Sequence, residues 1–145
     1  MTRAGAVSTI KATLEANTSP NFQVVLIGEP LTIPSGDRLA AAWFSGETLK
    51  AKTLGTVMVN ESWTIRCYWR VPAAAKGREN LELEIWNACR AVQSGFRGDS
   101  QLGGNVTDLE ISLATVGWSD IGGNTFRTIL FNLEIQDLEA ESISA

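Results

Sequence analysis

Apolar and polar residues alternate strictly between positions 61 and 71 of the chain. The apolar members occupy the odd-numbered positions, namely Trp63, Ile65, Cys67, Trp69 and Val71. Because successive side chains of a strand point to opposite faces, this pattern predicts a strand with one buried face. Val57 and Val59 continue the odd-numbered set, so the strand begins near Val57, is longer than strands usually are and could project as an arm or β-hairpin. Pro72 ends it.

Two other stretches have the spacing of an amphipathic helix. Val7, Ile10 and Leu14 predict a first helix, which ends at Asn17-Thr18-Ser19-Pro20 because the residue before a proline is pushed out of the α region. A second helix is predicted over residues 76–95. Its apolar stripe consists of Leu81, Ile85, Ala88, Cys89, Val92 and Phe96.

The remaining strands are predicted from shorter patterns. Residues 22–27 form a short strand inside a loop-rich stretch, and residues 39–45 form a buried strand that is apolar almost throughout. A loop is expected over residues 46–53, where the sequence becomes polar.

Two strands close the chain, over residues 106–118 and 126–136, each with alternating apolar positions. In the first of them, Leu109, Ile111 and Leu113 are expected to be buried. Between the strands, Gly122-Gly123 predicts a hairpin turn. The acidic residues 138–145 are expected to form a frayed tail.

The order of these elements predicts a single α+β domain over residues 1–145. We expect a mostly antiparallel, twisted sheet of about four to five strands with two helices packed on one face. No repeat, linker or low-complexity tract divides the chain.

Composition narrows the classes of function. The chain is 44% hydrophobic and 19% charged, as in ordinary globular proteins, and has no apolar run long enough to cross a bilayer. Its first residues lack the apolar core of a secretory signal, so we expect synthesis in the cytoplasm and no membrane partner.

Histidine is absent, which removes the commonest general base and the commonest metal ligand. Cys67 and Cys89 match no zinc or redox spacing and are expected to be reduced core residues. We therefore expect no catalytic residues, no metal, no cofactor and no enzymatic activity.

The charges are distributed unevenly along the chain. Residues 38–78 carry seven Lys or Arg and two Asp or Glu, whereas residues 79–145 carry three Lys or Arg and eleven Asp or Glu. The net charge of the whole chain is −4. Chance could produce this unevenness, because solvated faces scatter charge. A functional interpretation is that a basic patch on one copy meets an acidic patch on the next, in a head-to-tail contact. The acidic balance argues against nucleic acid as the main partner.

Tryptophan positions suggest where another subunit would bind. Trp63 and Trp69 share a strand face with Cys67 and are expected in the core, whereas Trp43 and Trp118 lie in or near turns, where aromatic residues are often half exposed. The candidate interface combines these two tryptophans with the hairpin turn and two strand arginines. Its residues are Trp118, Ser119, Asp120, Ile121, Gly122, Gly123, Asn124, Trp43, Arg66 and Arg70.

Three stretches together resemble the tail terminator (tail completion) proteins of long-tailed bacteriophages. They are IGEPLTIPSGD followed by AAAWFSGE, then VMVNESWTIRCYWRVP, and last the second helix followed by DSQLGGNVTDLEI and FRTILFNLEIQ. The resemblance covers nearly the whole chain. It implies a homo-hexameric ring in the virion, at the head-proximal end of the tail tube.

In that family the ring ends tube polymerisation and provides the surface for head attachment. The implied partners are the tail tube protein and head–tail connector or neck proteins, and DNA passes through the lumen without specific binding. The family offers no catalytic residues to transfer to this sequence.

Other functions remain open. The chain could be another ring of the phage neck or tube, such as a head-closure or tail tube protein. It could instead be a small-ligand or carbohydrate-binding module that uses Trp43 and Trp118 as stacking platforms. An enzyme would need carboxylates whose pKa is raised by burial.

Overall fold

The computed structural model describes residues 3–18, 21–32, 36–53 and 55–140, without the side chains of residues 49–53 and 138–140. Its five strands form one sheet in the order β1-β2-β3-β5-β4, in which β1 is parallel to β2 and all other pairs are antiparallel. The elements along the chain are α1 (Arg3–Glu15), β1 (Val24–Ile27), β2 (Arg38–Thr53), β3 (Thr56–Arg70), α2 (Ala75–Arg97), β4 (Asp108–Ile121) and β5 (Asn124–Ala140).

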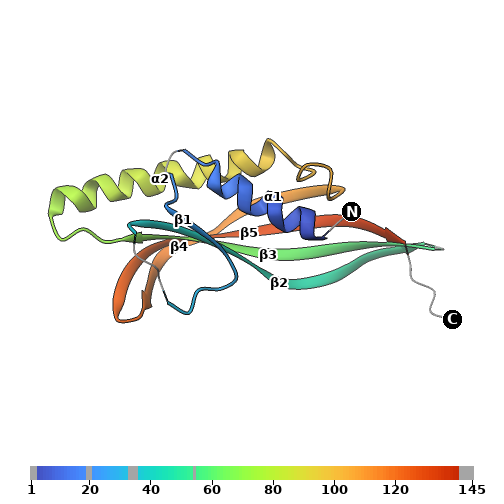
Figure 1. Ribbon diagram of the computed structural model, residues 1–145, viewed down its shortest axis with the longest axis horizontal. Coiled ribbons are helices and arrows are strands. Elements are labelled where there is room, and N and C mark those ends of the chain that lie inside the picture. The colour runs from blue at the N-terminus through green and yellow to red at the C-terminus, as the bar shows by residue number, and fades with distance from the viewer. Residues whose placement is uncertain (1–2, 19–20, 33–35, 54, 141–145) are drawn as a thin grey trace.

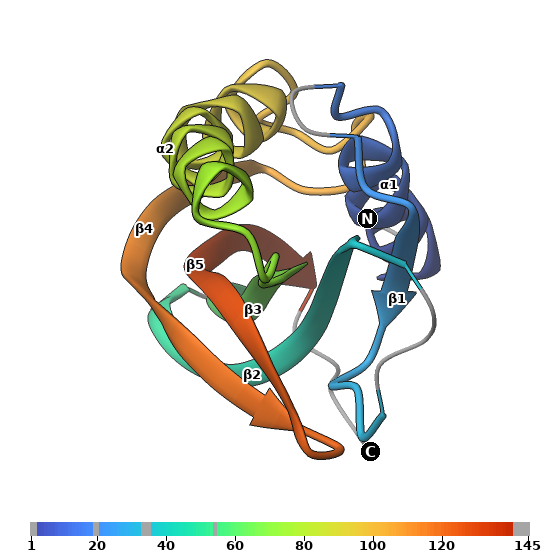
Figure 2. The same cartoon turned by 90° about the vertical axis from the view of Figure 1, so that its left-hand side faces the viewer.

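Both helices lie on the same side of the sheet (Figures 1 and 2). The predicted α+β architecture, with a mostly antiparallel sheet and two helices on one face, is therefore confirmed. We call the other side of the sheet the helix-free face.

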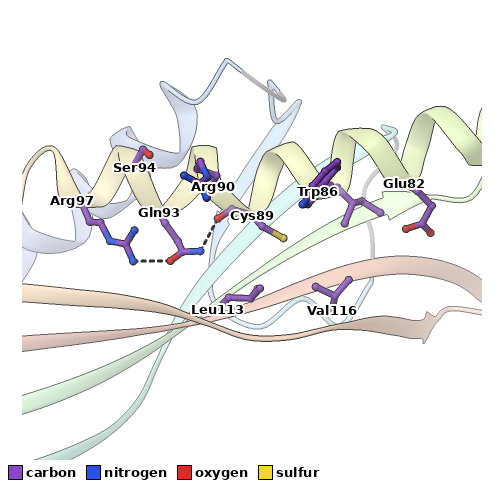
Figure 3. Close-up of a pocket in the computed structure, with 10 residues that line it drawn as sticks. Glu82, Trp86, Cys89, Arg90, Gln93, Ser94, Arg97, Leu113 and Val116 are labelled. Atoms are coloured by element: carbon purple, nitrogen blue, oxygen red, sulfur yellow. Dashed lines mark hydrogen bonds between the residues drawn. The ribbon is translucent and has the colours of Figure 1, made fainter.

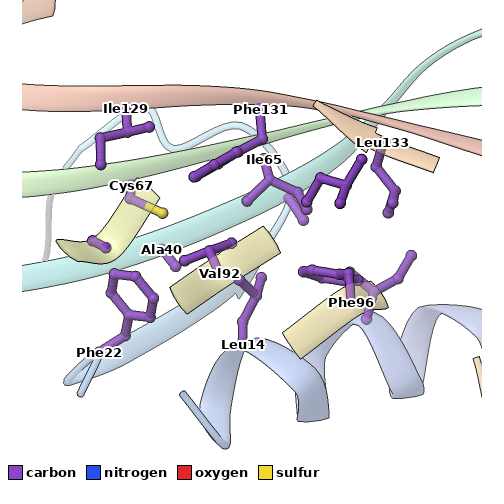
Figure 4. Packing of buried hydrophobic residues seen from close by; sticks show 14 of the residues in the cluster. Leu14, Phe22, Ala40, Ile65, Cys67, Val92, Phe96, Ile129, Phe131 and Leu133 are labelled. Atoms are coloured by element: carbon purple, nitrogen blue, oxygen red, sulfur yellow. The ribbon is translucent and has the colours of Figure 1, made fainter. Parts of the chain in front are cut away.

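The main core lies between the helices and the sheet (Figure 4). The stripe predicted for α2 is buried from Leu81 to Phe96, although Cys89 at its margin is only partly buried. In α1 the core-facing residues are Ala6, Ile10 and Leu14, so Ala6 takes the place predicted for Val7. Burying a large apolar side chain contributes about 1.5–3 kcal/mol, so this layer supplies most of the apolar stabilisation.

The alternation predicted for the long strand is confirmed in β3. Ile65, Cys67 and Trp69 are buried in the main core, and Trp63 packs against it from a partly buried position. A smaller apolar cluster lies on the helix-free face. Its buried residues are Leu39, Ala41, Tyr68 and Phe126, and the partly buried Val24, Leu26, Trp43 and Ile121 pack against them.

The loop predicted over residues 46–53 is wrong, because β2 continues to Thr53 in pairing with β3. The register shifts between Phe44 and Gly46 and again between Leu49 and Ala51. Each irregularity moves the side chains to the opposite face, so the period-two signal that would identify a strand is interrupted.

The prediction of a frayed tail over residues 138–145 is wrong for residues 138–140. Residues 138–140 belong to β5 and pair with the first residues of β3, so that Met58 lies opposite Leu138 and Thr56 opposite Ala140. Residues 141–145 lie outside the described part of the chain.

Strands β2, β3 and β5 continue together past the helices as a three-stranded ribbon (Figure 1). We call this ribbon, residues 49–53, 55–59 and 137–140, the arm. The projection expected from the length of β3 is thus confirmed, with β5 as its third strand.

Candidate subunit interface

The predicted hairpin is present, but its turn is shorter than the segment singled out in the sequence. β4 extends to Ile121 and β5 begins at Asn124, so only Gly122 and Gly123 form the turn. Their φ angles are 59° and 81°, the pair of positive values that a two-residue type I′ turn requires. Ile121 packs against the cluster on the helix-free face.

The other hairpin residues lie in paired strands. Ser119 is half-buried opposite Phe126, and Asp120 is exposed opposite Thr125. The Thr125 hydroxyl donates a hydrogen bond of 2.7 Å to the Asp120 carboxylate. The hairpin tip is thus an ordered projection rather than a loose loop.

Trp118 is exposed on the side of the sheet that carries the helices. The guanidinium carbon of Arg127 lies 4.9 Å from the centre of its ring. Arg127 also donates to Glu82 of α2, with an Nε–Oε1 distance of 2.9 Å, and to the Gly117 carbonyl, at 2.9 Å. Arg127 therefore ties α2 to both strands of the hairpin and fixes the position of Trp118.

Trp43, Arg66 and Arg70 lie on the helix-free face instead. Trp43 packs against the small cluster there. The Arg66 guanidinium lies 5.9 Å from the Tyr68 ring and that of Arg70 lies 5.2 Å from the Phe126 ring. The structure therefore divides the ten predicted interface residues between two faces, and they do not form one surface.

Tyr68 shows how closely the small cluster is packed. Burial raises the pKa of its hydroxyl, although the hydrogen bond and the charge of Arg66 act in the opposite direction. Arg66 Nε has no hydrogen-bond partner among the described residues, and Arg70 Nε donates to the Gly36 carbonyl at 2.7 Å.

A groove that the sequence did not reveal lies between α2 and β4, on the helix side (Figure 3). We call it the α2/β4 groove. It has a volume of about 570 Å³, and Trp86, Cys89, Leu113 and Val116 form its apolar part. Trp86 is 76% exposed, and Leu113 and Val116 are 40% and 37% exposed.

Basic side chains border this groove. Arg90 and Arg97 both extend from α2, and Arg97 donates to the Gln93 side-chain oxygen at 2.8 Å. Arg90 is exposed and takes part in no ion pair within the described part of the chain. The groove therefore combines apolar walls with these two arginines, and the Glu82 carboxylate that also lines it is paired with Arg127.

Leu113 was expected in the core, and its exposure is a correction. Leu113 has the same orientation as Leu109 and Ile111 but lies in the groove beside α2. The register of β4 with β5 shifts directly after it, between Leu113 and Thr115. Trp86 occupies a helix position next to the buried stripe, and its large apolar ring at that position was the signal available in the sequence.

β4 is also an edge of the sheet, because β5 is its only strand neighbour among the described residues. An edge strand presents unpaired backbone donors and acceptors, and proteins that stay monomeric usually protect such edges. A 14-residue edge beside an exposed apolar groove has the features of a subunit contact.

A second, smaller pocket of about 290 Å³ lies near the start of α1. Phe44, Trp63 and Val7 are among its apolar residues, and the carboxylate of Glu61 reaches it. Glu61 is 6% exposed and accepts an ion-pairing hydrogen bond of 3.2 Å from Arg3. Glu47 also lines this pocket and lies opposite Glu61 across β2 and β3.

No cluster of three or more His, Cys, Asp or Glu suited to a metal ion occurs among the described residues. Within the same part of the chain, neither helix is long and apolar enough to span a membrane.

No protein-family model matches the sequence. No curated protein matches it either. Among solved structures, the fold is similar to a sheath/tube terminator, in the extended state, of the extracellular contractile injection system PVC. The TM-score is 0.49 and the sequence identity 10%, over 100% of this chain and 61% of that one. This chain therefore spans less than two thirds of the terminator's length.

Proposed function

We propose that this chain is a structural ring subunit of a bacteriophage tail, placed at the head-proximal end of the tail tube. In this role it ends tube polymerisation and provides the surface to which the head attaches. The observation that carries the proposal concerns the described residues: their helices cover one face of the sheet only, and the edges at β1 and β4, on opposite sides, have no further strand (Figure 2).

Two different open edges suit a head-to-tail contact between copies. Such heterologous contacts generate closed rings when the rotation between neighbours divides a full turn. We propose a homo-hexamer, as the resemblance to tail terminators implies. The exposed apolar groove beside β4 supports the existence of a subunit contact.

The part of the helix-free face that lies near the arm carries polar groups suited to line a channel. Ser62 Oγ and Asn60 Nδ2 donate to the Glu134 carboxylate at 2.8 and 2.7 Å, and Thr64 Oγ1 donates to Ser45 Oγ at 3.1 Å. Affinity for nucleic-acid phosphates comes mainly from Lys and Arg. Arg66 and Arg70 lie on the same face, each over an aromatic ring of the small cluster. The hydroxyl, amide and carboxylate groups nearer the arm would let DNA pass without specific binding.

The arm supplies a means of reaching the next ring. It extends beyond both helices and is held by backbone pairing on both sides of β3 (Figure 1). We propose that it contacts the tail tube protein, and that the opposite end of the ring meets connector or neck proteins. The site of action is the virion, and no cofactor or catalytic residue is assigned.

Another neck or tube ring is the closest alternative, and self-assembly distinguishes it. A tube subunit would polymerise into long tubes without a partner, whereas a terminator would stop at one ring. A carbohydrate-binding module is less favoured because Trp43 and Trp118 lie on opposite faces of the sheet, so they cannot form one stacking platform.

The first test is the native mass of the purified protein, combined with negative-stain images of any large species. We expect a six-fold ring with a central hole, alone or when purified tail tubes are added. When the protein is added to growing tubes, capped tubes of limited length are the expected result. Long tubes formed by this chain alone would identify a tube subunit, and a monomer that binds no tube at any concentration would refute the ring.

A further inference from the structure

We propose that residues 27–31 of one copy dock in the α2/β4 groove of the next copy, so that the β1 edge of one sheet meets the β4 edge of its neighbour. The inference rests on the proposed ring and identifies the two surfaces that would hold it together. It assigns the contact to residues outside the hairpin segment singled out by the sequence.

The acceptor surface is the groove already described. Trp86, Leu113 and Val116 expose apolar surface toward it, and the backbone of β4 beside them has a free edge among the described residues. Its volume of about 570 Å³ lies within the range of pockets that hold bound groups.

The donor surface lies at the other edge of the sheet. Ile27 ends β1 and is 40% exposed, and Leu31 is 91% exposed. Glu29 lies between them in the sequence and is also exposed. This segment therefore exposes two large apolar side chains and one carboxylate, whose charge also reaches the Tyr68 hydroxyl.

The two surfaces complement each other in polarity and charge. Ile27 and Leu31 match the apolar walls of the groove, and the Glu29 carboxylate matches the guanidinium of Arg90, which has no ion pair in the described part of the chain. Charge pairs of this kind set the orientation and register of a contact between proteins.

The positions of the surfaces decide the type of assembly. β1 and β4 lie on opposite sides of the molecule (Figure 2), so the contact joins unlike surfaces of the two copies. Such a contact leaves one donor and one acceptor free in every open chain, and only closure of a ring uses them all.

The native Cys89 provides the test, because it lies in the groove and the other cysteine, Cys67, is buried. In the variant Leu31→Cys, docking would bring the introduced thiol of one copy close to Cys89 of the next, and mild oxidation would link them. We expect a ladder of cross-linked multimers on non-reducing gels that ends at the size of the ring. The same variant with Cys89→Ser should stay uncross-linked.

A cysteine on the other flank of α2 is the matched control. Leu83 is 55% exposed and lines a different surface, with Asn80 and Asn87. Leu83→Cys should therefore give no ladder with Cys89 under the same oxidation.

Mixing variants tests the direction of the contact. Trp86→Glu blocks the acceptor and Leu31→Glu blocks the donor, so neither variant alone should assemble. A 1:1 mixture should form dimers and nothing larger, because only one competent pair of surfaces remains. Leu83→Glu should assemble as the unmodified chain does.

The outcomes separate this inference from the proposed function. Six-fold rings without a cross-link between positions 31 and 89 would overturn the docking and leave the ring intact. A cross-linked ladder that continues into open filaments would support the docking and refute the terminator role. Cross-links that persist in the Cys89→Ser background would show a contact between like surfaces and overturn the docking.

Discussion

At the scale of single residues, the side chains between the helices and the sheet determine stability. Phe131 is fully buried in the centre of that layer (Figure 4). Phe131→Ala should lower the free energy of unfolding by about 3–5 kcal/mol, because it removes apolar contacts and leaves a cavity. Urea denaturation measures the change.

The control for this variant is Leu83→Ala, at a position 55% exposed on α2. It should change the free energy of unfolding by no more than about 0.5 kcal/mol, as most surface substitutions do. Equal losses at both positions would contradict the assignment of the core.

The buried thiol of Cys67 gives a dependence of stability on pH. Burial raises its pKa well above the ordinary 9.0, and the nearby Cys89 adds to the effect. Above that ordinary value the unfolded chain loses the proton while the folded chain keeps it, so stability is intact at lower pH and falls as pH rises past about 9.

Urea denaturation with a reductant at pH 7, 9 and 10 would measure this fall. The variant Cys67→Ala should lose stability at pH 7, because it leaves a cavity, but it should show a smaller decrease between pH 9 and 10. Ionisation of Tyr68 contributes part of the loss of stability at high pH in both proteins, because burial raises the pKa of its hydroxyl as well. An unchanged slope in the variant would refute the role of Cys67.

At the scale of elements, the β4–β5 hairpin depends on its turn. Gly123 has a φ of 81°, in the left-handed region that costs other residues about 1–2 kcal/mol. Gly123→Val should therefore destabilise the protein by that amount in thermal or urea unfolding. Because the hairpin positions Trp118, the tryptophan fluorescence of the variant should change as well.

Gly117 is the control within the same hairpin. A methyl group added there would meet no atom within 4 Å, and its φ is not in the positive range. Gly117→Ala should leave stability unchanged or raise it by up to about 1 kcal/mol, since glycine weakens a strand interior. A loss at Gly117 equal to that at Gly123 would show that the turn geometry is not the cause.

At the scale of the whole molecule, the arm and the core are separable. Thr48 of β2 lies opposite Asn60 of β3, so residues 49–59 can be replaced by Asn-Gly to close a shorter hairpin. We expect this variant to fold and to keep its subunit contacts, because α2 and β4 are untouched. It should fail to cap tail tubes in a binding assay with purified tubes.

Ring formation and the capping of tubes are measured separately in the shortened variant, so each outcome has its own meaning. Loss of ring formation in the shortened variant would show that the arm holds neighbouring copies together. Unchanged capping of tubes would remove the arm from the tube contact.

The sequence by itself determined the elements whose patterns are local. The alternation along β3, the stripe of α2 and the Gly122-Gly123 turn were all predicted correctly. Their signals follow from the covalent chain, because a strand repeats every two residues, a helix every 3.6, and a type I′ turn needs two positive φ angles.

Only the tertiary structure determined which strands, helices and side chains are neighbours. The second half of β2 is a strand because β3 pairs with it, although its own sequence is polar and its register shifts twice. Trp43 and Trp118 were grouped by their nearness to turns, yet the pleat places them on opposite faces of the sheet. The α2/β4 groove exists because α2 leaves Trp86, Leu113 and Val116 partly uncovered at an open edge. Strand order and helix placement arise from contacts between distant segments, which no local pattern of apolar residues specifies.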